Sequence, residues 1–306
     1  SRTSLMNLET GAWDADLCAL FGVPLQCLPE IGPTSGDLGR LPGGARLAVS
    51  IVDQQAALFG HGCHAPGSGK VTFGTGAFVQ CLTGALVRPE RPGPLPTVAW
   101  QRAGEPVTYA LDGGVYAAAS AVNWARGLGL FTDYAEISSF STRPAIDRGI
   151  VFVPALAGLG CPHWNRAARG AWLGLGLGSG KPDMVQALLE GVALRTAEVL
   201  VAMQDLQPFD GPISIDGGLS RNRYFVQFLS EVAGHDLFLA EESEQTAVGL
   251  VRMATETLVT ARPESQVGRH VAADNTHRTA RLETFGAARK AIEDFSDTTC
   301  KASNAP

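Results

Sequence analysis

Residues 213–234 read ISIDGGLSRNRYFVQFLSEVAG, and this stretch contains the local pattern that decides the fold. A β-forming run at 213–216 ends at two glycines and residues 222–233 follow as a helical segment, which predicts a strand, a tight turn and a helix. A strand at 236–239 and a helix at 244–258 repeat the alternation. Strands and helices that alternate in this way are typical of an α/β protein in which helices are layered on a sheet.

The clearest helical pattern lies upstream, at 182–204, where apolar residues recur at helical spacing and Pro182 stands in the first turn. Before it, strands are predicted at 149–156 and 171–175, on either side of a loop rich in Gly and aromatic residues. Further helices are expected at 12–23, 115–126 and about 280–295, and further strands at 46–52, 69–74, 77–83, 96–101 and 107–111. A chain of 306 residues has room for one large domain or two.

Composition argues against several classes of partner. The net charge is −6 and Lys and Arg are scattered, so no basic surface for a nucleic acid is indicated. The six cysteines form no CxxC pair and no His stands at ligand spacing, so neither a metal site nor a disulfide framework is predicted, and a reducing cytosol is favoured. Apolar runs stop well short of ~18 residues and residues 1–12 lack a signal pattern, which indicates a soluble, cytoplasmic protein without a membrane partner.

The first candidate for chemistry is Asp53-Gln54-Gln55, which follows the predicted strand 46–52 and opens an Ala-rich helical stretch. A carboxylate at the end of a strand can accept the proton of a substrate hydroxyl, and the neighbouring amides can hydrogen-bond a polyol. The alternative is that Asp53 only caps the following helix through the N–H groups of its first turn.

Two glycine-containing turns are candidates for binding phosphate or a nucleotide. Gly74-Thr75-Gly76 lies between two predicted strands, where a tight hairpin exposes N–H groups and a hydroxyl to an anionic phosphate. The alternative there is an ordinary hairpin with glycines at positive φ. Gly217-Gly218 ends another predicted strand, where backbone without side chains lets a nucleotide pack closely, and the alternative is a plain strand-to-helix turn.

The loop GCPHWN at 160–165 contains aromatic and His side chains of the kind that line pockets. However, His163 has no Asp or Ser partner in the neighbouring sequence. A packed surface loop is therefore the favoured interpretation.

In their order along the chain, these segments resemble the FGGY family of carbohydrate kinases, and within it the glycerol kinases. The matching strings cover nearly the whole chain and are SRTSLMNLETGAWDADLCALFGVP (1–24), DQQAALFGHGC (53–63), KVTFGTGAFVQCLTG (70–84), YALDGGVYAAASAVNW (109–124), VFVPALAGLGCPHWNRAARGAWLGL (151–175), ALLEGVALRT (187–196) and SIDGGLSRNRYFVQFLSEVAG (214–234). The likeness to glycerol kinases rests on DQQAALFG and GTGAF. Separated matches in the family's order are far more specific than any one of them alone.

The resemblance implies a ribonuclease H/actin-like α/β fold in which ATP and the sugar meet in a cleft between two domains. Residues 1–60 would be a remnant of the N-terminal domain, 61–295 the complete C-terminal, nucleotide-binding domain, and 296–306 a tail. The implied reaction is ATP-dependent phosphorylation of glycerol to glycerol 3-phosphate, with Mg²⁺ as the second cofactor. Family members often pair as dimers or tetramers, so a homo-oligomer is also expected.

Roles for single residues follow from the same resemblance. Asp53 corresponds to the base that takes the proton from the terminal hydroxyl, Gln54 to a polyol contact, and Phe78 to the side chain that packs against the carbon face of the polyol. The implied nucleotide-binding positions are Gly74, Thr75 and Gly76 along the phosphates, Gly217, Gly218 and Asn222 towards the adenosine end, and Ala119 and Asn123 on a helix wall near the nucleotide.

The sequence also departs from the family pattern. Val52 stands where the family usually has Gly, and its branched side chain is expected to crowd or strain the position. Ala119 and Asn123 replace Gly and Gln, which is expected to reduce nucleotide affinity. The family's N-terminal DxGTT-type phosphate loop has no counterpart in the chain. Two alternatives therefore stay open: a non-catalytic nucleotide-binding or regulatory remnant, and a kinase of another small polyol or sugar.

Overall fold

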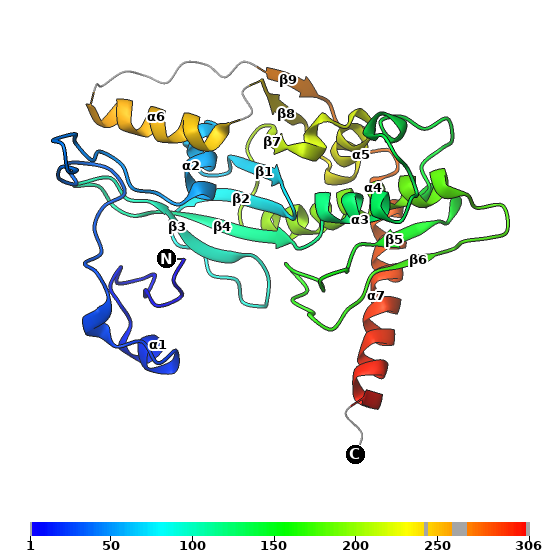
Figure 1. The fold of residues 1–306 in the computed structure, drawn as a ribbon, viewed down its shortest axis with the longest axis horizontal. Helices are drawn as coiled ribbons and strands as arrows, with labels where there is room; N and C mark the ends of the chain where they lie inside the picture. Colours follow the sequence, from blue (N-terminus) through cyan, green and yellow to red (C-terminus); the bar gives the residue numbers. More distant parts are fainter. Residues whose placement is uncertain (1, 242–243, 259–267, 304–306) are drawn as a thin grey trace.

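The computed structural model describes residues 2–241, 244–258 and 268–303, and a seven-stranded mixed sheet lies at its centre (Figure 1). The strands are β1 (Gly69–Phe73), β2 (Ala77–Gly84), β3 (Leu95–Trp100), β4 (Thr108–Val115), β7 (Ile213–Gly217), β8 (Leu237–Ala240) and β9 (Gly268–Val271). Their order across the sheet is β3-β4-β2-β1-β7-β8-β9. The strands β1 to β4 pair antiparallel, whereas β7 runs parallel to β1 and β8 parallel to β7. The α/β fold predicted from the alternating pattern is confirmed.

Helices cover both faces of this sheet. On one face α3 (Ala119–Gly127), α4 (Lys181–Gln204) and α5 (Arg223–Ala233) share a large apolar core with the strands. On the other face α2 (Asp53–Gly60) and α6 (Gln245–Leu258) pack together, and a smaller core forms around Phe59 and Trp100. The long α7 (Arg278–Ser303) packs against α4 and α5. Because side chains alternate along a strand, each strand sends one set of residues into each environment.

The predicted helices at 182–204, 222–233 and 244–258 are found within one residue of those bounds. Apolar residues recur at helical spacing within each of these segments, so the local sequence is sufficient to place the helices. Other bounds differ more. The first helix, α1 (Ala15–Leu20), is shorter than predicted because Asp14 caps it by accepting the N–H groups of Asp16 and Leu17. The last helix, α7, continues past the predicted end at 295 to Ser303.

The segment 46–52, predicted as a buried strand, is not one. It forms single bridges, such as that between Ser35 and Val49, and hydrogen bonds with the loop before it, such as Ser50 N–H to the Thr34 carbonyl at 2.9 Å. Its side chains are partly or fully exposed. A β-forming composition needs neighbouring strands to complete a ladder, and here the neighbour is only an irregular loop. Asp53 therefore follows an extended segment rather than a strand.

Smaller elements complete the fold. The strands β5 (Val151–Val153) and β6 (Ala171–Leu173) pair in a separate two-stranded sheet and are shorter than predicted. The edge strand β9 was not predicted, because four residues with no apolar alternation carry no strand signal. Short 3₁₀ turns lie at Leu25–Cys27, Tyr134–Ile137, Ile146–Arg148 and Gly218–Arg221. Within the described ranges, no helix combines the length and the apolar character needed to cross a membrane.

The helices α2 and α6 approach closely because glycine stands at their crossing on both sides. A Cβ on Gly249 would lie 1.8 Å from the carbonyl oxygen of Ala56, and a Cβ on Gly60 would lie 2.1 Å from the carbonyl oxygen of Gln245. Both distances are far below van der Waals contact, so no larger residue fits without moving a helix. The position of α2, and of Asp53 at its first residue, therefore depends on α6.

Candidate active site

A row of polar side chains crosses the sheet on the face that carries α2. Alternate residues of β1 enter the large core, so Lys70 points to the opposite face. The strand register places Lys70 beside Ser214 on β7 and Gln80 on β2, and places Gln80 beside Asp112 on β4. We call these four residues, Ser214, Lys70, Gln80 and Asp112, the polar row. Within the row Gln80 donates through Nε2 to Asp112 Oδ2 at 3.4 Å, while the buried Oε1 of Gln80 accepts no hydrogen bond from the described residues.

The ammonium of Lys70 lies between this row and the start of α2. Its Nζ donates to Gln54 Oε1 at 2.5 Å and to Thr72 Oγ1 at 2.9 Å. Burial lowers the pKa of Lys70 from 10.5 to about 8, while the carboxylates of Asp216 and Asp112 oppose that shift. A cation is thus held against the side chain that the sequence predicts to bind a polyol.

Asp53 is the first residue of α2, and its side chain is exposed. Its Oδ1 accepts the N–H of Gln54 at 2.7 Å, and the N-cap position belongs to Val52. The capping alternative, in which Asp53 accepts first-turn N–H groups, is therefore found in part, because one such bond forms, from the N–H of Gln54. The charge of this exposed carboxylate also favours the protonated form of Lys70, although its effect is smaller than those of Asp216 and Asp112.

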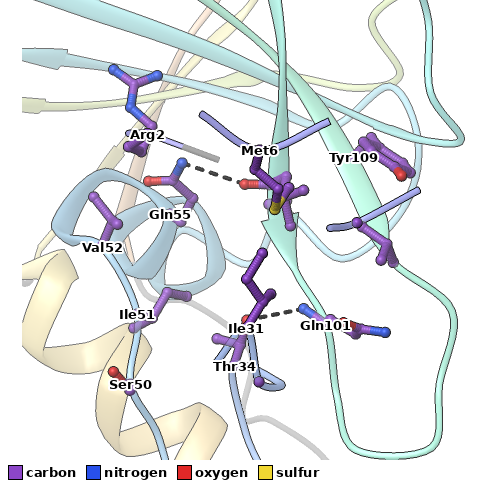
Figure 2. Close-up of a pocket in the computed structure, with 15 residues that line it drawn as sticks. Arg2, Met6, Ile31, Thr34, Ser50, Ile51, Val52, Gln55, Gln101 and Tyr109 are labelled. Carbon is purple, nitrogen blue, oxygen red and sulfur yellow. Dashed lines mark hydrogen bonds between the residues drawn. The ribbon is translucent and has the colours of Figure 1, made fainter. Parts of the chain in front are cut away.

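Figure 2 shows the other side of this helix start. Gln55 turns away from the polar row, is 3% exposed, and donates through Nε2 to the Val98 carbonyl at 3.4 Å. Of the two amides expected to be available to a polyol, only that of Gln54 faces the row. Val52 has φ −72° and ψ 146°, an ordinary extended conformation, so the backbone strain expected there is not found. Both residues line a cavity of about 160 Å³.

Phe78 contributes an apolar surface to the same face of the sheet. It stands opposite Thr72 in the pairing of β1 with β2, two residues from Gln80, and is 40% exposed. Side chains two apart on a strand share a face. The structure therefore brings Asp53, Gln54 and Phe78 to one face of the sheet, as the resemblance implied for a substrate site.

The hairpin Gly74-Thr75-Gly76 joins β1 to β2 and lies against the start of α3. The carbonyl oxygen of Thr75 accepts the N–H of Ala118 at 2.9 Å and that of Ser120 at 3.1 Å. The Thr75 side chain is exposed. Neither glycine has a positive φ, so the hairpin does not have the glycine geometry that the ordinary-hairpin alternative assumed.

A cavity of about 560 Å³ lies between α3, the turn after β7 and the segment 134–138. Four predicted nucleotide positions line it: Ala119, Asn123, Gly218 and Asn222. Tyr134 and Ile137 also line it and were not predicted. The sequence contains one local signal for this turn. Asp133 and Glu136 stand three residues apart, the spacing of a capping box, and they form one around the 3₁₀ turn at Tyr134–Ile137.

Gly217 shapes the turn beside this cavity without lining it. Its φ is +89°, and a Cβ there would lie 2.2 Å from the carbonyl oxygen of Phe73. Only glycine lets the end of β7 lie so close to β1. The space around Gly218 is open, because a Cβ there would meet no atom within 4 Å. Both glycines are exposed, and Gly218 is the one that lines the cavity.

Asn222 ties the walls of the cavity together. It is the N-cap of α5, where its Oδ1 accepts the N–H of Phe225 at 2.9 Å, and its Nδ2 donates to the Ile137 carbonyl at 2.9 Å. On the neighbouring wall, the Tyr134 hydroxyl donates to Asn123 Oδ1 at 2.5 Å. These bonds hold α3, α5 and the segment 134–138 in one arrangement.

We expect Asn222→Ala to lower the stability of the protein by about 1 kcal/mol, as loss of a helix N-cap does. The resemblance implies a nucleotide in this cavity, and the same change should then weaken ADP binding roughly tenfold, which corresponds to about 1.4 kcal/mol, because the wall at Ile137 is released. Thermal unfolding and titration calorimetry with ADP measure the two effects. The matched control is Asp14→Ala, which removes the side-chain cap of α1 and should leave ADP affinity unchanged. Unchanged ADP affinity in Asn222→Ala would mean that Asn222 serves the fold alone.

Glu190 of α4 is a buried carboxylate that holds the chain before β5. Its oxygens accept the N–H groups of Ala145 at 2.8 Å and Ile146 at 2.9 Å, and the hydroxyl of Tyr224 on α5. Burial raises the pKa of Glu190 from 4.5 to about 7, although these hydrogen bonds and the charge of Arg281 oppose the shift. The carboxyl therefore titrates in the folded protein near neutral pH.

This shift predicts a pH-dependent stability. A carboxyl whose pKa is raised by folding contributes stability that is complete below its unfolded pKa of 4.5 and is lost as the pH rises through about 7. The Tm of Glu190→Gln minus the Tm of wild type is therefore expected to be a few degrees larger at about pH 8 than at about pH 5. Glu283→Gln, at an exposed position on α7, should show the same Tm difference at both pH values. A pH-independent difference for Glu190→Gln would contradict the shifted pKa.

His163 finds its partner far along the chain. Its Nε2 lies 3.3 Å from Glu198 Oε2 on α4, and the same carboxylate pairs with Arg195 and Arg289. The neighbouring Trp164 donates through Nε1 to the Gly93 carbonyl at 2.9 Å. These contacts agree with the interpretation of residues 160–165 as a packed loop.

The chain offers little of its own to a metal ion. Over the described ranges, no three His, Cys, Asp or Glu side chains gather into a metal-binding group. Magnesium in kinases is commonly held by one or two carboxylates together with the phosphates of the nucleotide. An exposed carboxylate such as that of Asp53 does not amount to a protein cage.

Known proteins are similar in sequence to this chain. Residues 69–257 match a family model described as "FGGY family of carbohydrate kinases, C-terminal domain". A glycerol kinase from Bdellovibrio bacteriovorus is 40% identical over 262 residues, which cover 83% of this chain and 53% of the relative. The chain spans about half the length of the curated relatives that it matches.

Solved kinases share the fold as well. The crystal structure of Plasmodium falciparum glycerol kinase with ADP superposes with a TM-score of 0.82 at 25% identity, covering 94% of this chain and 61% of that one. A gluconate kinase from Lactobacillus acidophilus superposes with a TM-score of 0.81 at 18% identity, over 94% of this chain and 62% of that one, and shows the fold alone. The actin-like α/β fold expected from the resemblance is confirmed.

Proposed function

The chain belongs to the FGGY family of carbohydrate kinases, and from this we propose that it is the nucleotide-binding part of an ATP-dependent kinase that phosphorylates glycerol. One observation carries the proposal: the Gln54 amide contacts Lys70 of the polar row, the neighbouring Asp53 carboxylate is exposed, and the same sheet has strand ends that border a cavity of about 560 Å³. Relatives named glycerol kinase at 36% and 40% identity favour glycerol over other polyols.

In the proposed reaction Asp53 is the general base. The proton of a glycerol hydroxyl passes to its carboxylate while the hydroxyl oxygen bonds to the γ-phosphorus of ATP. The bond from that phosphorus to the bridging oxygen breaks, and ADP leaves. Phosphoryl transfer depends mainly on positioning and charge neutralisation, so the rigid attachment of α2 to the sheet is the main contribution of this chain. Gln54 binds a polyol hydroxyl, and Phe78 packs against the carbon face.

The nucleotide is proposed to lie across the end of the sheet. Its adenosine occupies the cavity lined by Ala119, Asn123, Gly218 and Asn222, where the open space at Gly218 permits close approach. Its phosphates extend along the hairpin at Thr75, whose exposed hydroxyl is a hydrogen-bond donor. Magnesium bound with the nucleotide would neutralise phosphate charge.

Two assays test the proposal separately. Calorimetry with ADP on the 306-residue chain tests the nucleotide site. Coupled assays of ADP formation, made on this chain and on the full reading frame that contains it, test the reaction. We expect ADP formation to depend on glycerol, and to be higher with glycerol than with xylulose or gluconate. A chain that binds no ADP would overturn the nucleotide site, and equal rates with all three compounds would overturn the choice of glycerol.

A non-catalytic binding role is the second candidate, because the chain spans about half the length of its curated relatives. In that case the chain would bind ADP, and neither polypeptide would phosphorylate a polyol or sugar. Glycerol-dependent turnover by either polypeptide excludes this role for the protein.

A further inference from the structure

We propose that Lys70 is a positioning residue for the substrate, because its buried ammonium fixes the Gln54 amide with the NH₂ group directed towards the polyol. The inference rests on the proposed function, since it assigns a role within the same site. Lys70 is 0% exposed, and its Nζ bonds Gln54 Oε1 at 2.5 Å and Thr72 Oγ1 at 2.9 Å. No role for this lysine follows from the general-base reaction itself.

The direction of the amide follows from the chemistry of the pair. A protonated lysine can only donate, so it selects the oxygen end of the glutamine amide and excludes the flipped orientation. The Nε2 of Gln54, with two N–H donors, then lies on the opposite side of the amide. A polyol oxygen that accepts from Nε2 keeps its own proton available to Asp53. With the amide flipped, Oε1 would compete with Asp53 for that proton.

The burial of a charge at this position supports a role beyond packing. Moving an ammonium out of water is costly, and an unbranched apolar residue such as Met would fill the same space without that cost. The cost is reduced by carboxylates on neighbouring elements, Asp216 on β7 and Asp112 on β4, whose charges raise the pKa of Lys70. Asp112 itself pairs with Arg2 at 2.8 Å. The chain thus maintains a buried charged group whose desolvation cost the neighbouring carboxylates reduce.

The far end of α2 is attached to the same sheet by polar groups. His61 Nδ1 lies 2.7 Å from Ser214 Oγ, and its Nε2 lies 3.2 Å from Asp216 Oδ2. Burial lowers the pKa of His61, although Asp216 opposes that shift. The helix is therefore held by Lys70 at its first turn and by β7 at its last. Loss of the Lys70 contact would free Gln54 while leaving the helix in place.

The charge of Lys70 can be removed within an accessible pH range. The groups that face it are Asp53 on α2, His61 at the end of α2, Asp112 on β4, Asp216 on β7, Cys63 in the loop after α2 and the neutral side chains of Gln54 and Thr72. Burial lowers the pKa of the ammonium to about 8. Below that pH the amide is fixed, and above it the neutral amine no longer selects the oxygen end. In wild type, kcat/KM for glycerol is therefore expected to fall as the pH rises through about 8.

The test is Lys70→Met, with Lys290→Met on the exposed face of α7 as the matched control. We expect kcat/KM for glycerol to fall about 10²-fold in Lys70→Met, the effect of a substrate displaced by about 1 Å, while KM for ATP is unchanged. The fall of kcat/KM at alkaline pH should disappear in Lys70→Met and persist in Lys290→Met. An active Lys70→Met enzyme that keeps the wild-type kcat/KM and pH profile would overturn the proposal.

A second measurement does not need turnover. In the isotopically labelled chain, the side-chain NH₂ resonances of Gln54 are expected to shift as the pH passes about 8, and to lose that titration in Lys70→Met. If Lys70→Met does not fold, Thr72→Val keeps the charge and removes the second acceptor, and the Gln54 resonances should then titrate at a different pH. Inactivity of both this chain and the full reading frame, with titrating Gln54 resonances, would reject the proposed function but retain the amide orientation. If the Gln54 NH₂ resonances of wild type do not shift with pH, the proposed orientation of the Gln54 amide is overturned.

Discussion

Replacing Asp53 by asparagine is expected to lower kcat for glycerol phosphorylation about 10²–10⁴-fold, the contribution typical of a positioned general base. An amide has nearly the same size as the carboxylate but cannot take the hydroxyl proton. The side chain is exposed and the N-cap of α2 is Val52, so the fold has little reason to change. ADP affinity and Tm should therefore stay close to wild type. Steady-state assays of ADP formation over a range of glycerol concentrations measure the effect.

The control for this prediction is Asp297→Asn, at an exposed position on α7. It changes the net charge by the same amount and should leave kcat unaltered. Retention of wild-type kcat in Asp53→Asn would remove Asp53 from the role of base. Loss of ADP binding in the same variant would instead assign Asp53 to the nucleotide.

The second large effect is expected from Gly249→Ala on α6. The added methyl group would meet the Ala56 carbonyl oxygen at 1.8 Å, and Gly60 lies at the same crossing. Because the obstructing atoms belong to the backbone, the helices must separate, and we expect a loss of about 3 kcal/mol, at the upper end of the usual cost of overpacking. The separation moves α2 and its first residue Asp53, so kcat/KM for glycerol should fall as well. Denaturant unfolding and steady-state kinetics measure the two consequences.

Gly286→Ala on α7 is the matched control, because a Cβ there meets no atom within 4 Å. The same substitution within an open helix surface is expected to raise stability by roughly 0.5–1 kcal/mol, since alanine is the better helix former. If both variants were equally stable, the close approach of α2 and α6 would not be what positions Asp53.

Local patterns were sufficient for much of the fold. The helices α4, α5 and α6 lie where apolar spacing predicted them, and the strands of the main sheet were mostly found within a few residues. The prediction of a strand at 46–52 was wrong for a physical reason. Strand-forming residues need partner strands, and the segment itself does not encode its partners. The edge strand β9 was missed for the converse reason, since its pairing with β8 compensates for a weak local signal.

The candidate site was predicted in part. The resemblance pointed to Ala119, Asn123, Gly218 and Asn222 separately, and the structure brings these four positions to one cavity. Tyr134 and Ile137 were missed, because nothing in a short loop indicates which distant helix it will face. Gln55 was expected beside the substrate with Gln54. Successive residues of a helix point in different directions, and the structure turns Gln55 towards β3.

The sequence by itself determined most of the strands and helices, the glycine turns and the presence of a carboxylate at position 53, because these depend on contacts within a few residues or on strings shared with a family. Only the tertiary structure decided that Lys70 lies beside Gln54 and that Ser214, Gln80 and Asp112 continue one polar row across four strands. The register between strands distant in sequence sets those neighbours, and the burial that gives Lys70 its lowered pKa arises only when helices close over the sheet.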